Sequence, residues 1–221
     1  LQGIADDPEN SDSLDYSAFL PKLGLTYELD EDQTVSFTVQ RGYRAGGAAF
    51  TFVEAHRPDS SGLDLYDPEY STTYEVAYRG SFNNDRLRVR GNVFFTEWTD
   101  MQISVPGLPT ATALDALFNF STSNAAKSEL YGFELSVESE PNDNLDLFAS
   151  VGYTRTKFVE FGSGELDPAI PGLVNPIDYS GNEFPFAPDW TASFGGKYTW
   201  DNGFGLGVDV SYKSASFQDN A

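Results

Sequence analysis

The sequence predicts an all-β fold of antiparallel strands, and three observations carry that prediction. Tight turns rich in Asp and Asn recur at residues 30–33, 83–86, 141–144 and 201–203. Runs of alternating apolar and polar residues flank every one of these turns. The other connections are long and rich in Gly, Pro, Ser and Asp. Short turns at one end of antiparallel strands and long loops at the other are the layout of a transmembrane β-barrel wall.

Alternation with a period of two residues predicts four strands in the first half of the chain: near 19–29, from Thr34, near 69–82 and from Arg86. Glu97 breaks the pattern of the fourth, so either a bulge intervenes or the strand has already left the membrane there. The apolar side chains on one face of these strands are Leu23, Leu25, Tyr27, Leu29, Val35, Phe37, Val39, Tyr70, Tyr74, Val76, Tyr78, Leu87, Val89, Val93 and Phe95.

The same period predicts four strands in the second half: near 128–140, from Leu145, near 190–200 and near 204–212. The chain therefore supplies about eight strands. Their apolar faces carry Tyr131, Phe133, Leu135, Val137, Leu145, Leu147, Ala149, Val151, Tyr153, Trp190, Ala192, Phe194, Tyr198, Trp200, Phe204, Leu206, Val208, Val210 and Tyr212.

Strand length and the position of the aromatic residues favour a barrel wall over a soluble β-sandwich. About 9–11 residues cross a bilayer at a tilt, whereas strands of globular proteins average about 5–6. Aromatic residues stand at the apolar strand ends beside the turns, where a membrane interface would lie: Tyr27, Tyr78, Phe82, Trp200 and Phe204. In such barrels the short turns face the periplasm, so the long loops near 46–66, 105–126 and 161–187 are expected outside the cell.

Composition narrows the classes of function. The 221 residues carry a formal net charge of −21, which argues against nucleic acid as a partner. The chain has no Cys, so it has neither disulfides nor a thiolate metal site. Residues 1–18 form an acidic loop leading into the barrel, without the pattern of a signal peptide. The sequence is therefore expected to begin inside a longer protein.

Six segments carry a resemblance to a known family. They are Phe19-Leu20-Pro21-Lys22-Leu23-Gly24-Leu25-Thr26-Tyr27, Arg41-Gly42-Tyr43-Arg44-Ala45-Gly46-Gly47, Tyr66-Asp67-Pro68-Glu69 followed by Tyr74-Glu75, Asn92-Val93-Phe94-Phe95-Thr96-Glu97-Trp98-Thr99-Asp100-Met101-Gln102-Ile103, Ser128-Glu129-Leu130-Tyr131-Gly132-Phe133-Glu134-Leu135, and Pro185-Phe186-Ala187-Pro188-Asp189-Trp190. In order and spacing, the chain resembles the middle of the barrel of TonB-dependent outer-membrane receptors. The resemblance implies that residues 19–221 are part of a 22-stranded barrel with a plugged lumen. The plug and the C-terminal strands are absent from this chain.

The resemblance also implies a location and a function. The protein is expected in the outer membrane of a Gram-negative bacterium, as a non-enzymatic receptor for TonB-energised uptake of a scarce nutrient. Ferric siderophores and similar chelates are the family's commonest cargo; vitamin B12-like and carbohydrate cargoes are alternatives. The expected partners are outer-membrane lipid, the TonB complex acting through the missing plug, and the small-molecule cargo. No cofactor is expected.

Two sets of candidate site residues follow from the strand and loop assignment. Side chains in or beside the long loops could form an aromatic and polar ligand-binding rim, because binding surfaces concentrate in loops on rigid scaffolds: Arg44, Phe50, Phe52, His56, Arg57, Phe184, Phe186 and Trp190. Alternation turns a second set of charged side chains into the lumen, together with Arg44: Glu75, Arg79, Arg88, Arg90, Asp209 and Lys213. The lumenal charges could pair with one another or with the plug, or guide an anionic ligand.

Other interpretations stay open. A small outer-membrane barrel could act as an adhesin or anchor, although an interior of Gly, Ser and Thr fits a wide barrel better. A barrel-borne hydrolase would need His56, the only histidine, but no Gly-x-Ser-x-Gly motif accompanies it. Acidic clusters at Asp7, Asn10, Asp12 and Asp15, and at Asp59, Asp64 and Asp67, do not fit the spacing of a calcium loop, so no metal site is expected.

Overall fold

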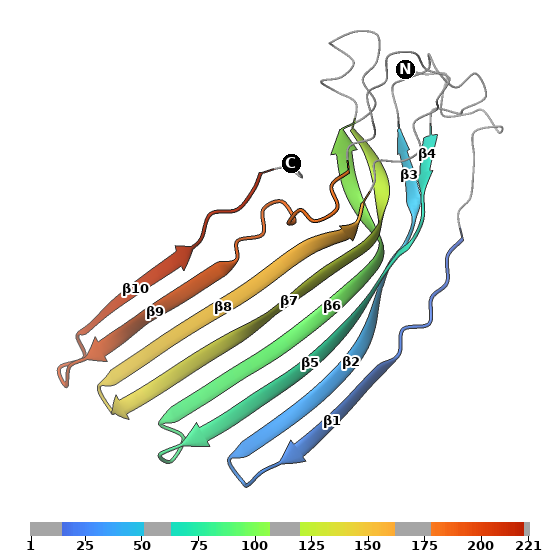
Figure 1. Cartoon of the computed structure of the whole chain (residues 1–221). Coiled ribbons are helices and arrows are strands. Elements are labelled where there is room, and N and C mark those ends of the chain that lie inside the picture. The colour runs from blue at the N-terminus through green and yellow to red at the C-terminus, as the bar shows by residue number, and fades with distance from the viewer. Residues whose placement is uncertain (1–14, 51–62, 107–119, 162–177, 219–221) are drawn as a thin grey trace.

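A computed structural model describes residues 15–50, 63–106, 120–161 and 178–218 as one curved antiparallel sheet with a small hairpin at its outer end (Figure 1). Eight strands pair in the order β1-β2-β5-β6-β7-β8-β9-β10, and β3 pairs with β4 separately. The strands are β1 (Lys22–Glu28), β2 (Gln33–Arg44), β3 (Gly47–Phe50), β4 (Leu63–Tyr66), β5 (Glu69–Phe82), β6 (Leu87–Pro106), β7 (Phe120–Asn142), β8 (Leu145–Glu160), β9 (Trp190–Thr199) and β10 (Gly205–Lys213). The eight predicted strands of the all-β wall are confirmed.

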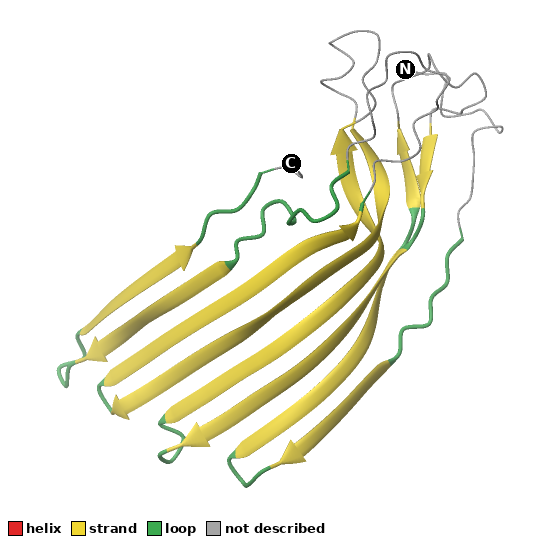
Figure 2. Ribbon diagram, viewed as in Figure 1, coloured by secondary structure: helices red, strands yellow, loops and turns green. Residues whose placement is uncertain are grey.

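The four predicted tight turns lie together at one end of the sheet (Figure 2). Asp30 accepts a hydrogen bond from the backbone N–H of Asp32 at 2.9 Å, which closes the first turn. Asn83, Asn84 and Asp85 all have positive φ, a conformation that Asn and Asp adopt more readily than most residues. Gly203 closes the last turn with φ of 83°. The local chemistry of these residues therefore fixes where the chain reverses.

The register places the apolar side chains of all eight strands on one face. Leu25 pairs with Phe37, Phe37 with Val76, and Val76 with Val93. The row continues through Phe133 to later strands. These side chains are exposed although they are apolar; Leu25 is 62% exposed and Val93 is 54% exposed. No second layer covers this face among the described residues, so a dry two-layer sandwich is excluded.

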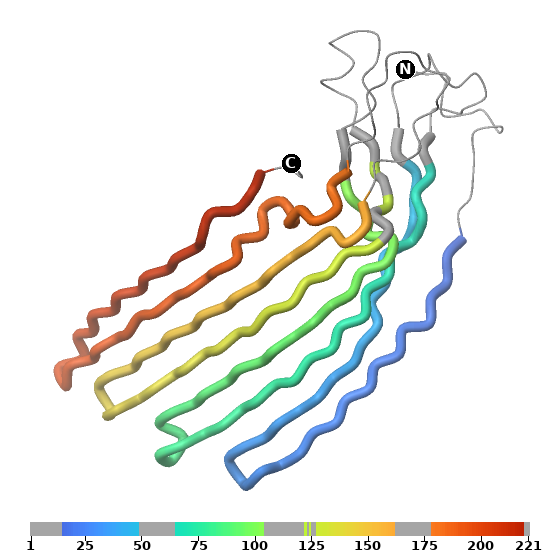
Figure 3. Tube along the Cα trace, in the orientation of Figure 1, coloured from blue at the N-terminus to red at the C-terminus, as the bar shows by residue number. Residues whose placement is uncertain are grey.

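The opposite face is polar and concave. Thr38 stands opposite Glu75, Ser136 opposite Ser150, and Asp146 opposite Lys197. β1 and β10 lie at opposite edges of the curved sheet, blue and red in Figure 3. A wall with an apolar convex face and a polar concave face is suited to a membrane on one side and an aqueous interior on the other.

Two aromatic belts bound the convex face. On three strands, one aromatic residue of each belt stands eight residues from its counterpart in the other: Tyr70 and Tyr78 on β5, Trp190 and Tyr198 on β9, and Phe204 and Tyr212 around β10. Eight residues span about 27 Å along a strand, or about 19–22 Å along the membrane normal at a tilt of about 35–45°. This height approaches the apolar band of about 25 Å in outer-membrane barrels. The inner belt was predicted from the turns; the outer belt was not.

Strand extents differ from the prediction at the loop end. The loop predicted at 46–66 contains the β3–β4 hairpin. The loop predicted at 105–126 is shorter than expected, because β6 extends to Pro106 and β7 begins at Phe120. The pairing of β6 with β5 and β7 is unshifted at Glu97. Glu97 therefore lies on the convex face towards the outer end of the sheet, without a bulge at its position.

Two phenylalanines depart from the pattern and lie on the concave face, each opposite a glycine. Phe94 pairs with Gly132, and Phe148 pairs with Gly195. Each ring occupies space that a side chain on the partner strand would need, since a Cβ on Gly132 would come within 2.9 Å of Phe94 Cζ. Glycine lets the wall keep a large ring on its inner side without forcing the strands apart.

We expect Gly132→Ala to destabilise the protein by about 1–3 kcal/mol, the usual cost of overpacking. The new Cβ would collide with the backbone carbonyl oxygen of Tyr153, which cannot move without disturbing the β7–β8 pairing. The midpoint of denaturant unfolding in detergent measures the effect. Gly207→Ala is the matched control, because its nearest atom would be 3.6 Å away. Equal stability of both variants would contradict the packing described here.

Candidate functional site

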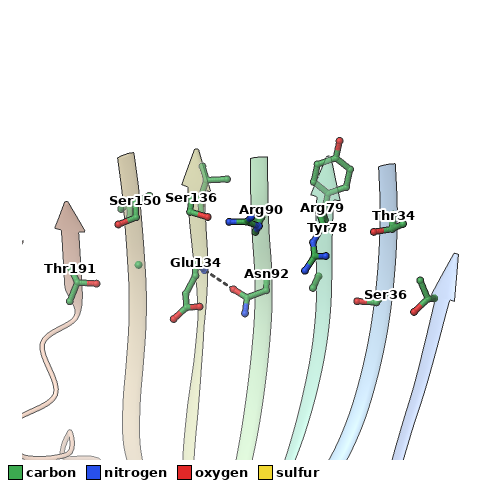
Figure 4. Close-up of a pocket in the computed structure, with 16 residues that line it drawn as sticks. Thr34, Ser36, Tyr78, Arg79, Arg90, Asn92, Glu134, Ser136, Ser150 and Thr191 are labelled. Atoms are coloured by element: carbon green, nitrogen blue, oxygen red, sulfur yellow. Dashed lines mark hydrogen bonds between the residues drawn. The ribbon is translucent and has the colours of Figure 1, made fainter. Parts of the chain in front are cut away.

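A hollow of about 630 Å³ lies on the concave face near the middle of the wall. Residues of β1, β2, β5, β6, β7, β8 and β9 line it, and Figure 4 shows how they line up across neighbouring strands. The lining is mixed in character, with hydroxyl groups and charges beside small apolar groups. Its polar side chains on the concave face are Thr26, Thr34, Ser36, Arg79, Arg90, Asn92, Glu134, Ser136, Ser150 and Thr191.

Two predicted lumenal arginines are held by carboxylates of the neighbouring strand. Arg90 Nη1 lies 2.9 Å from Glu138 Oε1, and Arg88 Nη1 lies 3.8 Å from Glu138 Oε2. Arg88 Nη1 also lies 4.0 Å from Glu140 Oε1. All four groups are roughly half exposed, so these pairs add little to stability. They fix the direction of the side chains on the concave face.

Arg79 is different because it stands directly opposite Arg90 on the adjacent strand. Like charges in that arrangement repel. Glu138 compensates Arg90, but no carboxylate among the described residues lies within 4.0 Å of the Arg79 guanidinium. Glu75 is engaged by the amide of Asn92 at 3.2 Å. Arg79 is thus an uncompensated cation beside the hollow.

The remaining residues predicted to face the lumen also lie on the polar, concave face. Asp209 stands opposite Gly195, and Lys213 stands opposite Thr191, at the outer end of β10. Arg44 ends β2 opposite Glu69. Among the described residues, none of Asp209, Lys213 and Arg44 makes an ion pair within 4.0 Å.

At the outer end of the wall, residues 178–189, here called the strap, run along the edge of β8 beyond its pairing with β9. The N–H of Phe158 donates to the carbonyl of Asn182, and the N–H of Thr154 donates to that of Asp189, both at 2.9 Å. Ser180 closes the turn that starts the strap, and its hydrogen bonds lower the pKa of Asp178. The strap therefore satisfies edge groups of β8 that would otherwise be unpaired.

An aromatic cluster anchors the strap to the wall. Its buried members are Phe158 (0% exposed), Phe161, Tyr179 and Phe184. The ring centroids of Phe158 and Phe184 are 4.7 Å apart, and Trp98 packs on Phe184 at 6.1 Å. Because β6 keeps an unbroken register from Leu87 to Thr99, the Trp98 side chain lies on the concave face with those of Phe94 and Thr96. The cluster is the one sizeable apolar core among the described residues. It lies at the outer, loop-bearing end of the sheet, here called the mouth, rather than in the membrane span.

Ion pairs hold the strap on its other side. Arg155 Nη2 lies 2.6 Å from Glu183 Oε1, and Arg155 Nη1 lies 3.0 Å from Asp189 Oδ2. Arg155 belongs to the convex row of β8, opposite Tyr131. The strap is thus fastened through rings on the concave side and charges on the convex side.

The predicted ligand-binding residues of this region separate into three environments. Phe184 is 9% exposed within the aromatic cluster, where its ring is a packing element. Trp190 lies on the convex face against Tyr153, with ring centroids 4.8 Å apart, as part of the outer belt. Phe186 is 73% exposed.

Phe186 also adopts an unusual backbone conformation, with φ of 58°. A bulky residue in the left-handed region is strained, and such strain gathers at functional sites. Its N–H donates to the carbonyl of Phe217 at 2.7 Å, which helps to hold the conformation. Phe52, His56 and Arg57 lie outside the described residues, as does the side chain of Phe50.

A polar latch, which the sequence analysis missed, joins the β3–β4 hairpin to the long β6–β7 hairpin. The side-chain amide of Gln102, 8% exposed, donates to the carbonyls of Ala45 at 2.8 Å and Asp67 at 3.1 Å. Asn124 donates to the same Asp67 carbonyl at 3.0 Å and accepts from the Asp67 N–H at 2.9 Å. These contacts connect residues far apart in the sequence, so no local sequence pattern predicts them.

We expect Gln102→Ala to free the β3–β4 hairpin while leaving the membrane span intact. The loss of two hydrogen bonds at a buried position should cost about 1–3 kcal/mol locally. Hydrogen exchange should become faster in β3 and β4 and stay slow in the middle of β5. Gln40→Ala, at an exposed glutamine of β2, is the control. Unchanged exchange in the hairpin would show that the latch does not hold it.

No group of three or more His, Asp or Glu side chains able to hold a metal ion occurs among the described residues. They also include no helix that is long and apolar enough to cross a membrane.

The geometry defines a class of protein: part of the wall of a transmembrane β-barrel, with a polar inner face and a strap fastened at its outer end. The family model described as "TonB dependent receptor-like, beta-barrel" matches residues 2–221, and the chain belongs to this family. Its members are outer-membrane proteins of Gram-negative bacteria, and they are transporters rather than enzymes. The expected family and location are confirmed. The convex face therefore meets lipid, and the concave face looks into the barrel.

Three known proteins illustrate the similarity. The probable TonB-dependent siderophore receptor PiuA of Acinetobacter baumannii is 22% identical over 217 residues, covering 96% of this chain and 26% of that protein. The structure of the ferric yersiniabactin uptake receptor FyuA from Yersinia pestis matches with a TM-score of 0.65 and 20% identity, covering 91% of this chain and 26% of that one. The copper transporter OprC matches with a TM-score of 0.56 and 17% identity, covering 81% and 24%. At these identities the structures establish the fold alone, and the chain spans about a quarter of each relative.

Proposed function

We propose that this wall is part of a receptor that imports a ferric siderophore or a similar anionic chelate, driven by the TonB complex. The observation that carries the proposal is the match of the whole wall, over residues 2–221, to the TonB-dependent receptor barrel. PiuA is named as a probable siderophore receptor and FyuA as an uptake receptor for ferric yersiniabactin, which supports a ferric chelate as the cargo. TonB would act through a plug that lies outside this chain.

The concave face suits the passage of an anion. Arg79 is a cation without a carboxylate partner among the residues that the structure describes, in a chain whose formal net charge is −21. Such a charge on a barrel wall attracts an anionic solute, or a carboxylate of a plug, into the lumen. Arg88 and Arg90 are already engaged by Glu138 and contribute less free charge.

The mouth suits recognition. The strap and the latch hold the outer hairpins to the rigid sheet, so residues presented there keep their positions before a ligand arrives. We propose that Phe186 contacts the cargo, because its ring is exposed and its backbone is held in a strained conformation. Arg44 and Lys213 stand at the outer ends of the polar rows and could complement negative charge on the chelate.

Copper is a second cargo class, favoured by the match to OprC. Copper(I) prefers thiolate and thioether ligands. The chain contributes no Cys and one Met. That methionine, Met101, packs against the aromatic cluster. A chelate recognised through rings and cations fits the residues of this wall better than a bare copper ion.

Uptake by the full-length receptor tests the proposal. Cells that lack other siderophore receptors should accumulate iron-55 from a ferric siderophore when they express the receptor, and only when TonB is present. Phe186→Ala should weaken siderophore binding about five- to thirtyfold, as removal of an aromatic contact does. Phe194→Ala, an exposed ring on the lipid face, is the control.

Other outcomes would assign other functions. Cell adhesion without TonB-dependent uptake of any ferric siderophore would contradict the proposal and favour an adhesin. Hydrolysis of an ester substrate that is lost in His56→Ala would instead support a barrel-borne enzyme. Uptake of copper alone would make the metal rather than its chelate the cargo.

A further inference from the structure

Charged side chains on the convex face gather at its outer end. One cross-strand row contains Arg41, Thr72, Glu97, Glu129 and Lys157, which pair in succession from β2 to β8. On β2 and β5 this row lies two residues to the membrane side of Tyr43 and Tyr70 in the outer aromatic belt. A long basic side chain can reach the headgroups of the outer leaflet from this position.

Within this row, the two acids already have a partner. Lys127 Nζ lies 3.5 Å from Glu97 and 3.3 Å from Glu129. Lys157 stands directly opposite Glu129. At the other end of the row, Arg41 has Thr72 opposite it and no carboxylate within 4.0 Å among the described residues. Arg41 is therefore an exposed, uncompensated cation on the lipid-facing side of the wall.

The contacts of Arg41 hold its guanidinium in a defined place. Its Cζ lies 4.5 Å from the centre of the Tyr70 ring, in a cation–π contact. The Tyr43 ring also packs against the Tyr70 ring, with centroids 5.4 Å apart. When one face of a guanidinium rests on a ring, its N–H groups remain free in the plane and can bind a phosphate with two parallel hydrogen bonds.

A second group at this place lacks a polar partner. The hydroxyl of Tyr43 is buried, and no described residue accepts or donates a hydrogen bond to it. A buried hydroxyl without a partner is unfavourable. One anionic oxygen acceptor beside Tyr70 would accept hydrogen bonds from both the Arg41 guanidinium and the Tyr43 hydroxyl.

We propose that Arg41, Tyr43 and Tyr70 form a binding site for the phosphate headgroup of a lipid in the outer leaflet. The neighbouring residues favour a lipid over a free phosphate ion. Leu23 and Val39 pair with each other one step towards the membrane centre, and Leu23 is 61% exposed. An acyl chain can lie along this surface while the phosphate meets Arg41. The charge on Arg41 is then neutralised at the depth where leaving it unpaired is costly.

The test uses the full-length receptor in lipid nanodiscs, with bisphosphorylated lipid A as the probe and dephosphorylated lipid A of the same acyl composition as its counterpart. Native mass spectrometry measures the binding of each. Arg41→Gln should weaken binding of the phosphorylated lipid about fivefold, which corresponds to about 1 kcal/mol for one basic side chain at an anionic membrane surface. Binding of the dephosphorylated lipid should not change. Arg41→Lys should keep part of the affinity, because it preserves the charge but not the planar fork.

The control is Lys22→Gln. Lys22 stands opposite Gln40, next to Arg41, but in the concave row. Equal binding by Arg41→Gln and the unmodified receptor would overturn the proposal. An equal loss in Lys22→Gln would attribute the effect to general charge, and displacement of the lipid by inorganic phosphate would indicate an aqueous ion site; both would also overturn it. The site depends on the location of the sheet in the membrane and not on the cargo. A failed uptake assay would therefore not contradict the proposed lipid site.

Discussion

Replacement of Val39 by arginine is expected to lower the free energy of unfolding by about 2–4 kcal/mol. Val39 lies midway along β2, four residues from Tyr43 at the outer belt and four from Val35, whose cross-strand partner is Tyr27 at the inner belt. Its side chain points from the convex face. An arginine there would place its charge near the middle of the bilayer. Urea unfolding of the full-length receptor in lipid vesicles measures the loss.

Thr38→Arg is the matched control, one residue away on the opposite face. Thr38 stands opposite Glu75, so an arginine at this position gains a carboxylate and an aqueous surrounding. We expect a change within about 0.5 kcal/mol, as for surface substitutions without a special role. A larger loss from Thr38→Arg than from Val39→Arg would reverse the assignment of the two faces.

Phe158→Ala is expected to destabilise the outer mouth by about 3–5 kcal/mol, the usual cost of removing a buried aromatic side chain. Phe158 is completely buried, and its ring contacts Phe161 and Phe184 at centroid distances of 5.0 and 4.7 Å. Its loss should release the strap. Hydrogen exchange should become fast in residues 178–189, while the middle of β8 stays protected.

Phe217→Ala removes a ring of the same size that is 54% exposed, and should leave the strap in place. Its backbone carbonyl still accepts the hydrogen bond from Phe186. Slow exchange of the strap in Phe158→Ala would mean that the ion pairs of Arg155, and not the rings, fasten it. Siderophore binding by both variants would then show whether an ordered strap matters for recognition.

The sequence predicted the membrane span well because two-residue alternation is a strong signal in a wall with different solvents on its two faces. The strand predicted near 69–82 is β5 as observed, and the four turns lie where Asp, Asn and Gly placed them. Alternation also predicted the polar row that contains Glu75 and Arg79, because a charge on the lipid face is costly.

The signal fades beyond the membrane, where both faces of a strand meet water or protein. β7 begins eight residues before the predicted start at Ser128, in a run of Ser, Thr, Asn and Ala without a clear period. The four-residue strands β3 and β4 are held by the latch of Gln102 and Asn124, which no local pattern reveals.

Side-chain roles at the mouth depended on tertiary contacts that residue type does not indicate. Phe184, Phe186 and Trp190 look alike in the sequence, as aromatic residues near a proline-containing segment. The structure buries the first in the aromatic cluster, exposes the second and places the third in the outer belt. Of these three, Phe186 is the residue that we propose contacts the ligand.

The central claim is that the convex face of the sheet meets lipid and the concave face meets water. Spin labels at successive positions of β5, in the full-length receptor in liposomes, test it most directly; this chain has no native Cys to interfere. Labels at Tyr74, Val76 and Tyr78 should be accessible to molecular oxygen, which partitions into lipid. Labels at Glu75 and Ala77 should be accessible to a water-soluble nickel complex. Equal accessibility along the strand, or the opposite alternation, would contradict this account.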